Sequence, residues 1–82
     1  MKINVTKEDI DLGSRLNPFG CPVARAINRH LWFKNASVCC GRVIRCGHLT
    51  VKSYGLPESV YSKIREYDRT SYMAPFEFDL PL

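Results

Sequence analysis

Hydrophobic and polar residues alternate near both ends of the chain. Ile3 and Val5 alternate with polar neighbours at the start, and Phe76, Phe78 and Leu80 do so at the end. Because side chains two positions apart lie on the same face of a strand, each pattern predicts a short strand with one buried face.

Between these strands, two segments have apolar residues at the three- and four-residue spacing of a helix. The first begins at Cys21-Pro22, since proline is favoured at the first helical position, and we expect it to end near Phe33. The second begins within 56–59, and 69–75 is expected to be a connector. The expected buried stripes are Val23, Ala26, Ile27, His30 and Leu31 in the first helix, and Val60, Tyr61, Ile64 and Tyr67 in the second.

A third helix of one or two turns is expected after Thr6, which can cap it, and Gly13 can end it. Residues 37–46 and 48–54 contain β-branched residues that favour strands, and Gly47 between them predicts a hairpin turn. Gly41 is interpreted as a bulge that changes the phase of the first strand. The face that Arg42 takes therefore stays open.

The order strand, helix, strand, strand, helix, strand predicts an α+β fold, with a single domain over residues 1–82. Two helices would cover one face of a four-stranded, mostly antiparallel sheet. A ferredoxin-like split arrangement fits this order, and other strand orders stay open.

The chain contains no apolar run long enough to cross a bilayer, and its start turns polar within two residues. We therefore expect a cytoplasmic protein with no membrane partner. Its cysteines, Cys21, Cys39, Cys40 and Cys46, are expected to be reduced thiols.

The charged residues are unevenly distributed. Between Leu12 and Pro57 there are seven arginines and lysines and no acid, and all eight acids lie nearer the two ends. Such an asymmetry favours an anionic partner, although a basic, solvated face that keeps a small protein soluble is the simpler interpretation.

Cys21 lies at a helix N-terminus, where the pKa of a thiol can fall. A nucleophilic thiol also needs a base, and His30 stands nine residues on, about 13 Å along the same helix. We interpret Cys21 as the residue that starts the helix. The remaining cysteines and His48 lack the paired spacing of a structural zinc site, so we expect no metal. Since Cys21 has no base within reach, we also expect no enzymatic activity, and we expect no cofactor.

The candidate binding residues combine basic side chains with aromatic ones. The charges would steer an encounter and the aromatic rings would anchor it, although Trp32 could instead close the edge of the core. The basic set is Arg25, Arg29, Lys34, Arg42, Arg45 and Lys52, and the aromatic set is Trp32, Phe33 and Tyr54.

Three short stretches resemble a group of small proteins encoded by bacteriophages and prophages. They are Val5-Thr6-x-Glu8-Asp9-Ile10-x-x-Gly13, Cys21-Pro22-Val23-Ala24-x-Ala26-Ile27 and Pro75-Phe76-Glu77-Phe78-x-Leu80. These stretches are mostly fold determinants and include no catalytic motif. The resemblance implies a phage protein in the cytoplasm of a bacterial host, where small phage proteins often bind and inhibit host or defence machinery.

We therefore predict a non-enzymatic phage accessory protein that binds an acidic host protein or nucleoprotein and inhibits or modulates it. Direct binding of nucleic acid is the first alternative, and it predicts an affinity that falls steeply with salt. The second is a sponge for a phosphorylated signal molecule, seated near Cys21 and Arg25 in a homo-oligomer and stabilised by its ligand.

Overall fold

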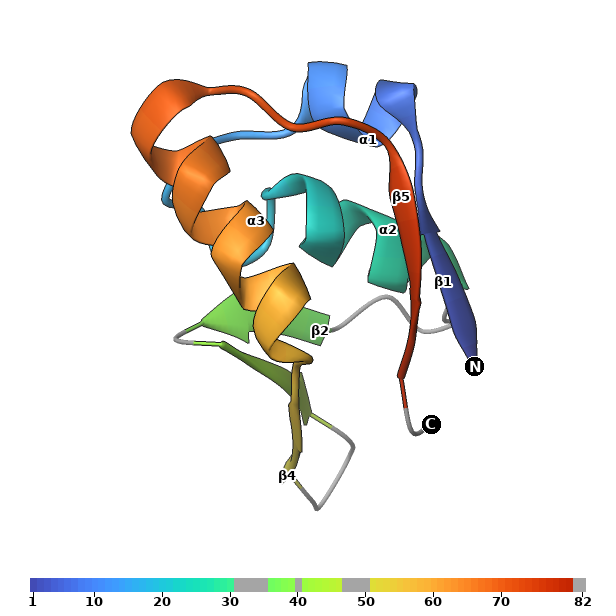
Figure 1. Ribbon diagram of the computed structural model, residues 1–82. Helices are drawn as coiled ribbons and strands as arrows, with labels where there is room; N and C mark the ends of the chain where they lie inside the picture. The colour runs from blue at the N-terminus through green and yellow to red at the C-terminus, as the bar shows by residue number, and fades with distance from the viewer. Residues whose placement is uncertain (31–35, 40, 47–50, 81–82) are drawn as a thin grey trace.

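The computed structural model describes residues 1–30, 36–39, 41–46 and 51–80, and Figure 1 shows their arrangement. The elements are β1 (Lys2–Val5), α1 (Lys7–Leu12), α2 (Pro22–His30), β2 (Ala36–Cys39), β3 (Arg42–Cys46), β4 (Val51–Gly55), α3 (Glu58–Thr70) and β5 (Phe76–Asp79). This combination of helices and antiparallel strands confirms the predicted α+β class.

The strands form two sheets, so the prediction of one four-stranded sheet was wrong in this detail. β1 pairs with β5, and β2, β3 and β4 form a separate antiparallel sheet. Helix α2 contacts both β1 and β2 and lies between the two sheets (Figure 1). The described residues therefore do not form a ferredoxin-like sheet.

The outer edge of β2 is already hydrogen-bonded, which explains why the two sheets do not join. The Ala36 N–H donates to Asn28 Oδ1 at 2.8 Å, and the Val38 N–H donates to Pro18 O at 2.8 Å. Because the loop before α2 and the helix itself already bind these groups, they cannot serve as hydrogen-bond donors to another strand.

The segment predicted as one strand at 37–46 consists of β2 and β3, which pair antiparallel. Gly41 belongs to the turn between them and has φ +76°, a conformation that favours glycine, so the prediction of a bulge was wrong. The predicted hairpin between β3 and β4 is confirmed by their register, in which Cys46 is opposite Val51. Its predicted turn at Gly47 lies outside the described residues.

The helix boundaries follow local signals. In α1, the Asp9 N–H donates to Thr6 Oγ1 at 3.3 Å and the Thr6 N–H donates to Asp9 Oδ2 at 2.9 Å, which forms a capping box. Helix α3 continues to Thr70, past the expected boundary, and ends at Ser71, which has φ 65°. The predicted end of α2 near Phe33 lies outside the described residues.

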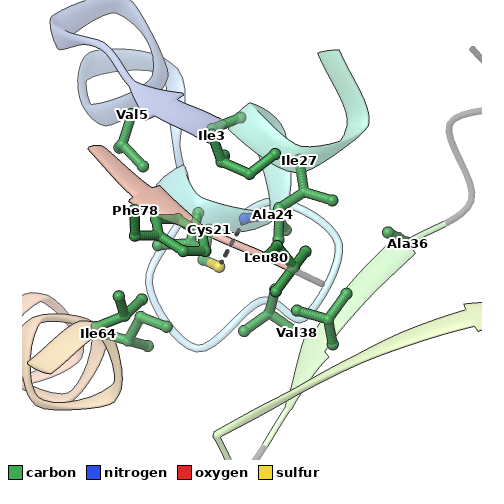
Figure 2. Close-up of a cluster of buried hydrophobic side chains, with 14 of the residues drawn as sticks. Ile3, Val5, Cys21, Ala24, Ile27, Ala36, Val38, Ile64, Phe78 and Leu80 are labelled. Atoms are coloured by element: carbon green, nitrogen blue, oxygen red, sulfur yellow. Dashed lines mark hydrogen bonds between the residues drawn. The ribbon is translucent and has the colours of Figure 1, made fainter. Parts of the chain in front are cut away.

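The core lies where the two sheets, α2 and α3 meet (Figure 2). The predicted alternation is confirmed at Ile3 and Val5 and at Phe78 and Leu80, which are all buried. The helix stripes contribute Val23, Ala26, Ile27, Val60, Ile64 and Tyr67, whereas His30 and Tyr61 are only half-buried.

Candidate functional site

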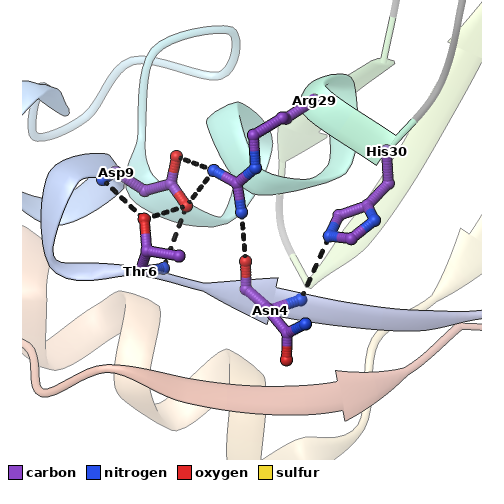
Figure 3. A network of polar contacts seen from close by, with 5 residues as sticks. All are labelled: Asn4, Thr6, Asp9, Arg29 and His30. Atoms are coloured by element: carbon purple, nitrogen blue, oxygen red, sulfur yellow. Dashed lines mark hydrogen bonds and ion pairs between the residues drawn. The ribbon is translucent and has the colours of Figure 1, made fainter.

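Arg29 has partners within the fold. Its Nη1 lies 2.5 and 2.6 Å from the two carboxylate oxygens of Asp9, and its Nη2 donates to Asn4 O at 2.6 Å (Figure 3). The carboxylate of Asp9 is only 3% exposed. This predicted binding residue therefore joins α2 to α1 and β1, and its charge is balanced by Asp9.

The environment of Asp9 favours its charged form. Burial alone would raise the pKa of Asp9, but hydrogen bonds from Arg29 and Thr6 outweigh burial and lower the pKa. The sequence identified Thr6 as a cap but gave no signal for the Arg29 contact, because Arg29 is 20 residues from Asp9.

Unlike Arg29, Arg25 forms no ion pair with a described carboxylate, although both residues lie on α2. Its Nε is buried and has no hydrogen-bond partner among the described residues. The side chain lines an open hollow of about 380 Å³ with Glu8, Phe19 and Asn28, and Asp9 and Arg29 complete its wall. Since Asp9 and Arg29 neutralise each other, Arg25 is the cation in this hollow that has no ion pair with a described residue.

The basic residues of the hairpin are divided between the two faces of the sheet. Arg45 is opposite Lys52 in the register, and Tyr54 follows on the same face as Lys52 and opposite the buried Val43. Arg42 lies on the other face, where its Nε donates to Ser53 Oγ at 2.6 Å. The four predicted hairpin residues therefore do not form one continuous surface.

Cys21 is 4% exposed, and its Sγ accepts a hydrogen bond from the Ala24 N–H at 3.4 Å (Figure 2). Burial raises the pKa of the thiol, and the negative charge of Asp68 acts in the same direction. The thiol thus caps α2, which begins at the next residue. This geometry supports the interpretation of Cys21 as the start of the helix.

His30 lies at the other end of α2, and its Nε2 accepts a hydrogen bond from the Asn4 N–H at 3.4 Å (Figure 3). Over the residues that the structure describes, no three His, Cys, Asp or Glu side chains gather as a metal site would require. In the same part of the chain, no helix has the length and apolar character of a membrane span. Cys40 and His48 lie outside it.

Three of the predicted binding residues, Trp32, Phe33 and Lys34, lie outside the described residues. The structure adds two residues that sequence reasoning missed, Leu16 and Phe19, in the loop between α1 and α2. They are 78% and 66% exposed. Asn17-Pro18 and Gly20 indicated a loop here, but they could not show that its apolar side chains point outwards.

Comparisons of the chain with protein-family models, with curated proteins and with solved structures found no match.

Proposed function

We propose that the protein is a non-enzymatic binding module that recognises an anionic partner through Arg25 and the surface around it. Arg25 carries the proposal because it lines an open hollow and forms no ion pair with a described carboxylate. Its Nε is also buried without a hydrogen-bond partner among the described residues, and an unsatisfied buried polar group costs about 1–3 kcal/mol. Because the Nε itself is covered, an anionic partner would stabilise the guanidinium charge from the open side of the hollow.

The surroundings of Arg25 suit recognition by a partner. Phe19 offers an exposed aromatic ring in the same hollow, and arginine and aromatic residues dominate the hot spots of protein interfaces. Asn28, on the same wall, is fixed by its hydrogen bonds to Ala36. The hollow therefore presents a cation, an apolar ring and a fixed polar side chain.

The resemblance to small phage proteins supplies the biological setting of the proposal. In a bacterial cytoplasm, the partner would be an acidic host protein or nucleoprotein, which the protein would inhibit or modulate by occupying its surface. The absence of Asp and Glu between Leu12 and Pro57 supports electrostatic steering towards such a partner.

Direct binding of nucleic acid is a second candidate, and the hairpin favours it. Lys52 and Tyr54 share one face of β4, and Arg45 is opposite Lys52. Cations on one strand face can follow a phosphate backbone, but Tyr54 is half-buried against the core, so these cations carry this candidate. This candidate depends on β3 and β4, whereas the leading proposal depends on Arg25 in α2.

Titration of two fluorescent probes, poly-L-glutamate and a 20-nucleotide single strand, distinguishes the two candidates. The leading proposal predicts that poly-L-glutamate binds and that Arg25→Met weakens it about tenfold, because a charge-assisted hydrogen bond is lost. Arg69→Met is the matched control, since Arg69 is an exposed arginine of α3 that pairs with Glu66.

Binding of the oligonucleotide alone, weakened by Lys52→Ala and unaffected by Arg25→Met, would favour the nucleic-acid candidate instead. Equal affinity of the wild type and Arg25→Met for poly-L-glutamate would contradict the leading proposal. Circular dichroism of each variant shows that the fold is retained.

A further inference from the structure

Leu16 has an unusual backbone conformation for a large apolar residue. Its φ of 57° lies in the left-handed region, and Ser71 is the one other non-glycine residue with positive φ in the part of the chain described. A left-handed conformation is unfavourable by about 1–2 kcal/mol for a residue with a side chain. Such strain is typical of segments that clamp ligands.

The surrounding loop is held in this shape from several sides. The Leu16 N–H donates to Asp68 Oδ1 of α3 at 3.0 Å, and Asn17 Oδ1 accepts from the N–H groups of Phe19 and Gly20, at 3.1 Å each. Pro18 O accepts from the Val38 N–H. Because the loop is fixed before any partner arrives, binding would cost it little conformational entropy.

Side chains of this loop line two hollows, and its exposed residues Leu16 and Phe19 are together called the ridge. Leu16 lines a hollow of about 280 Å³ whose other walls include Val38, Ile64 and Arg65. Phe19 lines the hollow of about 380 Å³ that contains Arg25. Both volumes are near or below the lower limit for small-molecule sites, so each hollow suits an inserted side chain.

Each hollow contains an arginine that has no ion pair with any described residue. Arg25 is the first, and Arg65 is the second, with its guanidinium 5.6 Å from the centre of the Tyr61 ring. Each hollow therefore combines an exposed apolar side chain of the ridge with an arginine, and each also contains a carboxylate, Glu8 beside Arg25 and Asp68 beside Arg65. This arrangement complements a partner that has both apolar and anionic groups.

We propose that this ridge, formed by Leu16 and Phe19 and flanked by Arg25 and Arg65, is the docking surface for a protein segment with apolar side chains flanked by carboxylates. The inference rests on the proposed function, because Arg25 is common to both, and it names the class of partner. The apolar side chains of the partner would enter the hollows, and its carboxylates would pair with the arginines.

The same geometry argues for a protein rather than a nucleic acid. Glu8 lies in the hollow of Arg25, and Asp68 lies in the hollow of Arg65. A partner that spans both hollows therefore needs acids against the arginines and uncharged groups opposite Glu8 and Asp68, which a peptide of mixed sequence can provide and a continuous phosphate backbone cannot, whereas poly-L-glutamate needs to reach Arg25 alone. Leu16 also has no ring on which a base could stack.

Selection of a random dodecapeptide library on the wild-type protein tests this inference. We expect enriched peptides to combine Leu, Ile, Phe or Trp with Asp or Glu. The affinity of the best peptide should fall at least tenfold in Leu16→Gly, Phe19→Ser and Arg65→Gln. Leu16→Gly is the sharpest variant, because glycine relieves the positive φ while removing the side chain, so the fold should be retained.

Val51→Ser is the matched control, since Val51 is 69% exposed on β4 and lines neither hollow. Enriched peptides without acids, or equal affinity for the wild type and Leu16→Gly, would overturn the inference. If poly-L-glutamate binding still depended on Arg25 in that case, the proposed function would stand without this docking surface. Self-association of the wild type that is lost in Leu16→Gly would also overturn the inference, since the occupant of the ridge would then be a second copy of the protein.

Discussion

The side chain of Asn28 binds both backbone groups of Ala36, the N–H and the carbonyl oxygen, as a neighbouring strand would. Its Oδ1 accepts from the Ala36 N–H and its Nδ2 donates to Ala36 O, both at 2.8 Å. One side chain of α2 thus fixes the start of β2 and also forms part of the wall beside Arg25. The proposed site is therefore connected directly to the fold.

Replacement of Asn28 by alanine should destabilise the protein by about 2–4 kcal/mol, because two backbone groups of the buried Ala36 lose their partners. Asn28→Asp retains the acceptor for the Ala36 N–H but sets a carboxylate oxygen against Ala36 O, so it should also destabilise the protein at neutral pH and recover partly in acid, where a protonated Asp can donate. Chemical denaturation measures both. A loss below about 0.5 kcal/mol in Asn28→Ala would contradict this role for the side chain.

The pair formed by Asp9 and Arg29 predicts a loss of stability in acid. Since the folded state lowers the pKa of Asp9, its stabilisation is complete above the ordinary value of 3.8 and is lost as pH falls through the lowered pKa. Asp9→Asn should be less stable than the wild type at pH 7, and the difference should shrink below pH 4. Thermal unfolding between pH 7 and pH 2 measures it.

Glu77→Gln is the control for this pH dependence, because Glu77 and Lys2 form an exposed pair 3.7 Å apart, and such pairs contribute little. Its unfolding curve should follow that of the wild type over the same pH range. A difference between Asp9→Asn and the wild type that stays constant into acid would contradict the assignment to Asp9.

Gly41→Ala should destabilise the turn between β2 and β3 by about 1–2 kcal/mol, because its φ of +76° is unfavourable for alanine. The added Cβ would also lie 3.3 Å from the Tyr61 ring. Gly55→Ala is a suitable comparison, since the nearest atom to its added Cβ, Arg42 Nη1, is 3.9 Å away. Equal unfolding temperatures for the two variants would contradict this account of the turn.

Cys21 should react slowly with iodoacetamide at pH 7, because burial both covers the thiol and raises its pKa. Cys39 is exposed and should be modified earlier. Peptide mapping by mass spectrometry after short exposures separates the two thiols. Modification of Cys21 ahead of Cys39 would indicate a reactive thiol and would reopen the case for thiol chemistry.

Local patterns in the sequence predicted most of the individual elements. The alternation around Ile3 and Phe78, the cap at Thr6 and the start of α2 at Pro22 each depend on neighbouring residues, so they can be identified from the chain alone. The arrangement of the strands could not be predicted in this way. It depends on Asn28 and Pro18 covering the edge of β2, and both contacts join residues distant in sequence.

The residues of the candidate site could not be identified from local sequence patterns either. The distribution of charge along the sequence did not distinguish the role of Arg25 from that of Arg29, because both residues lie in one predicted helix and are four residues apart. Only the fold distinguishes them, since Asp9 reaches Arg29 and no described carboxylate pairs with Arg25. Similarly, the outward direction of Leu16 and Phe19 depends on tertiary hydrogen bonds to Asp68 and Val38.

A pull-down from nuclease-treated bacterial lysate with the wild type, Arg25→Met and Arg69→Met tests whether Arg25 binds a protein partner. We expect a protein that is retained by the wild type and by Arg69→Met and is lost with Arg25→Met. Equal retention by all three proteins, or capture that disappears with nuclease treatment, would contradict binding of a protein partner through Arg25.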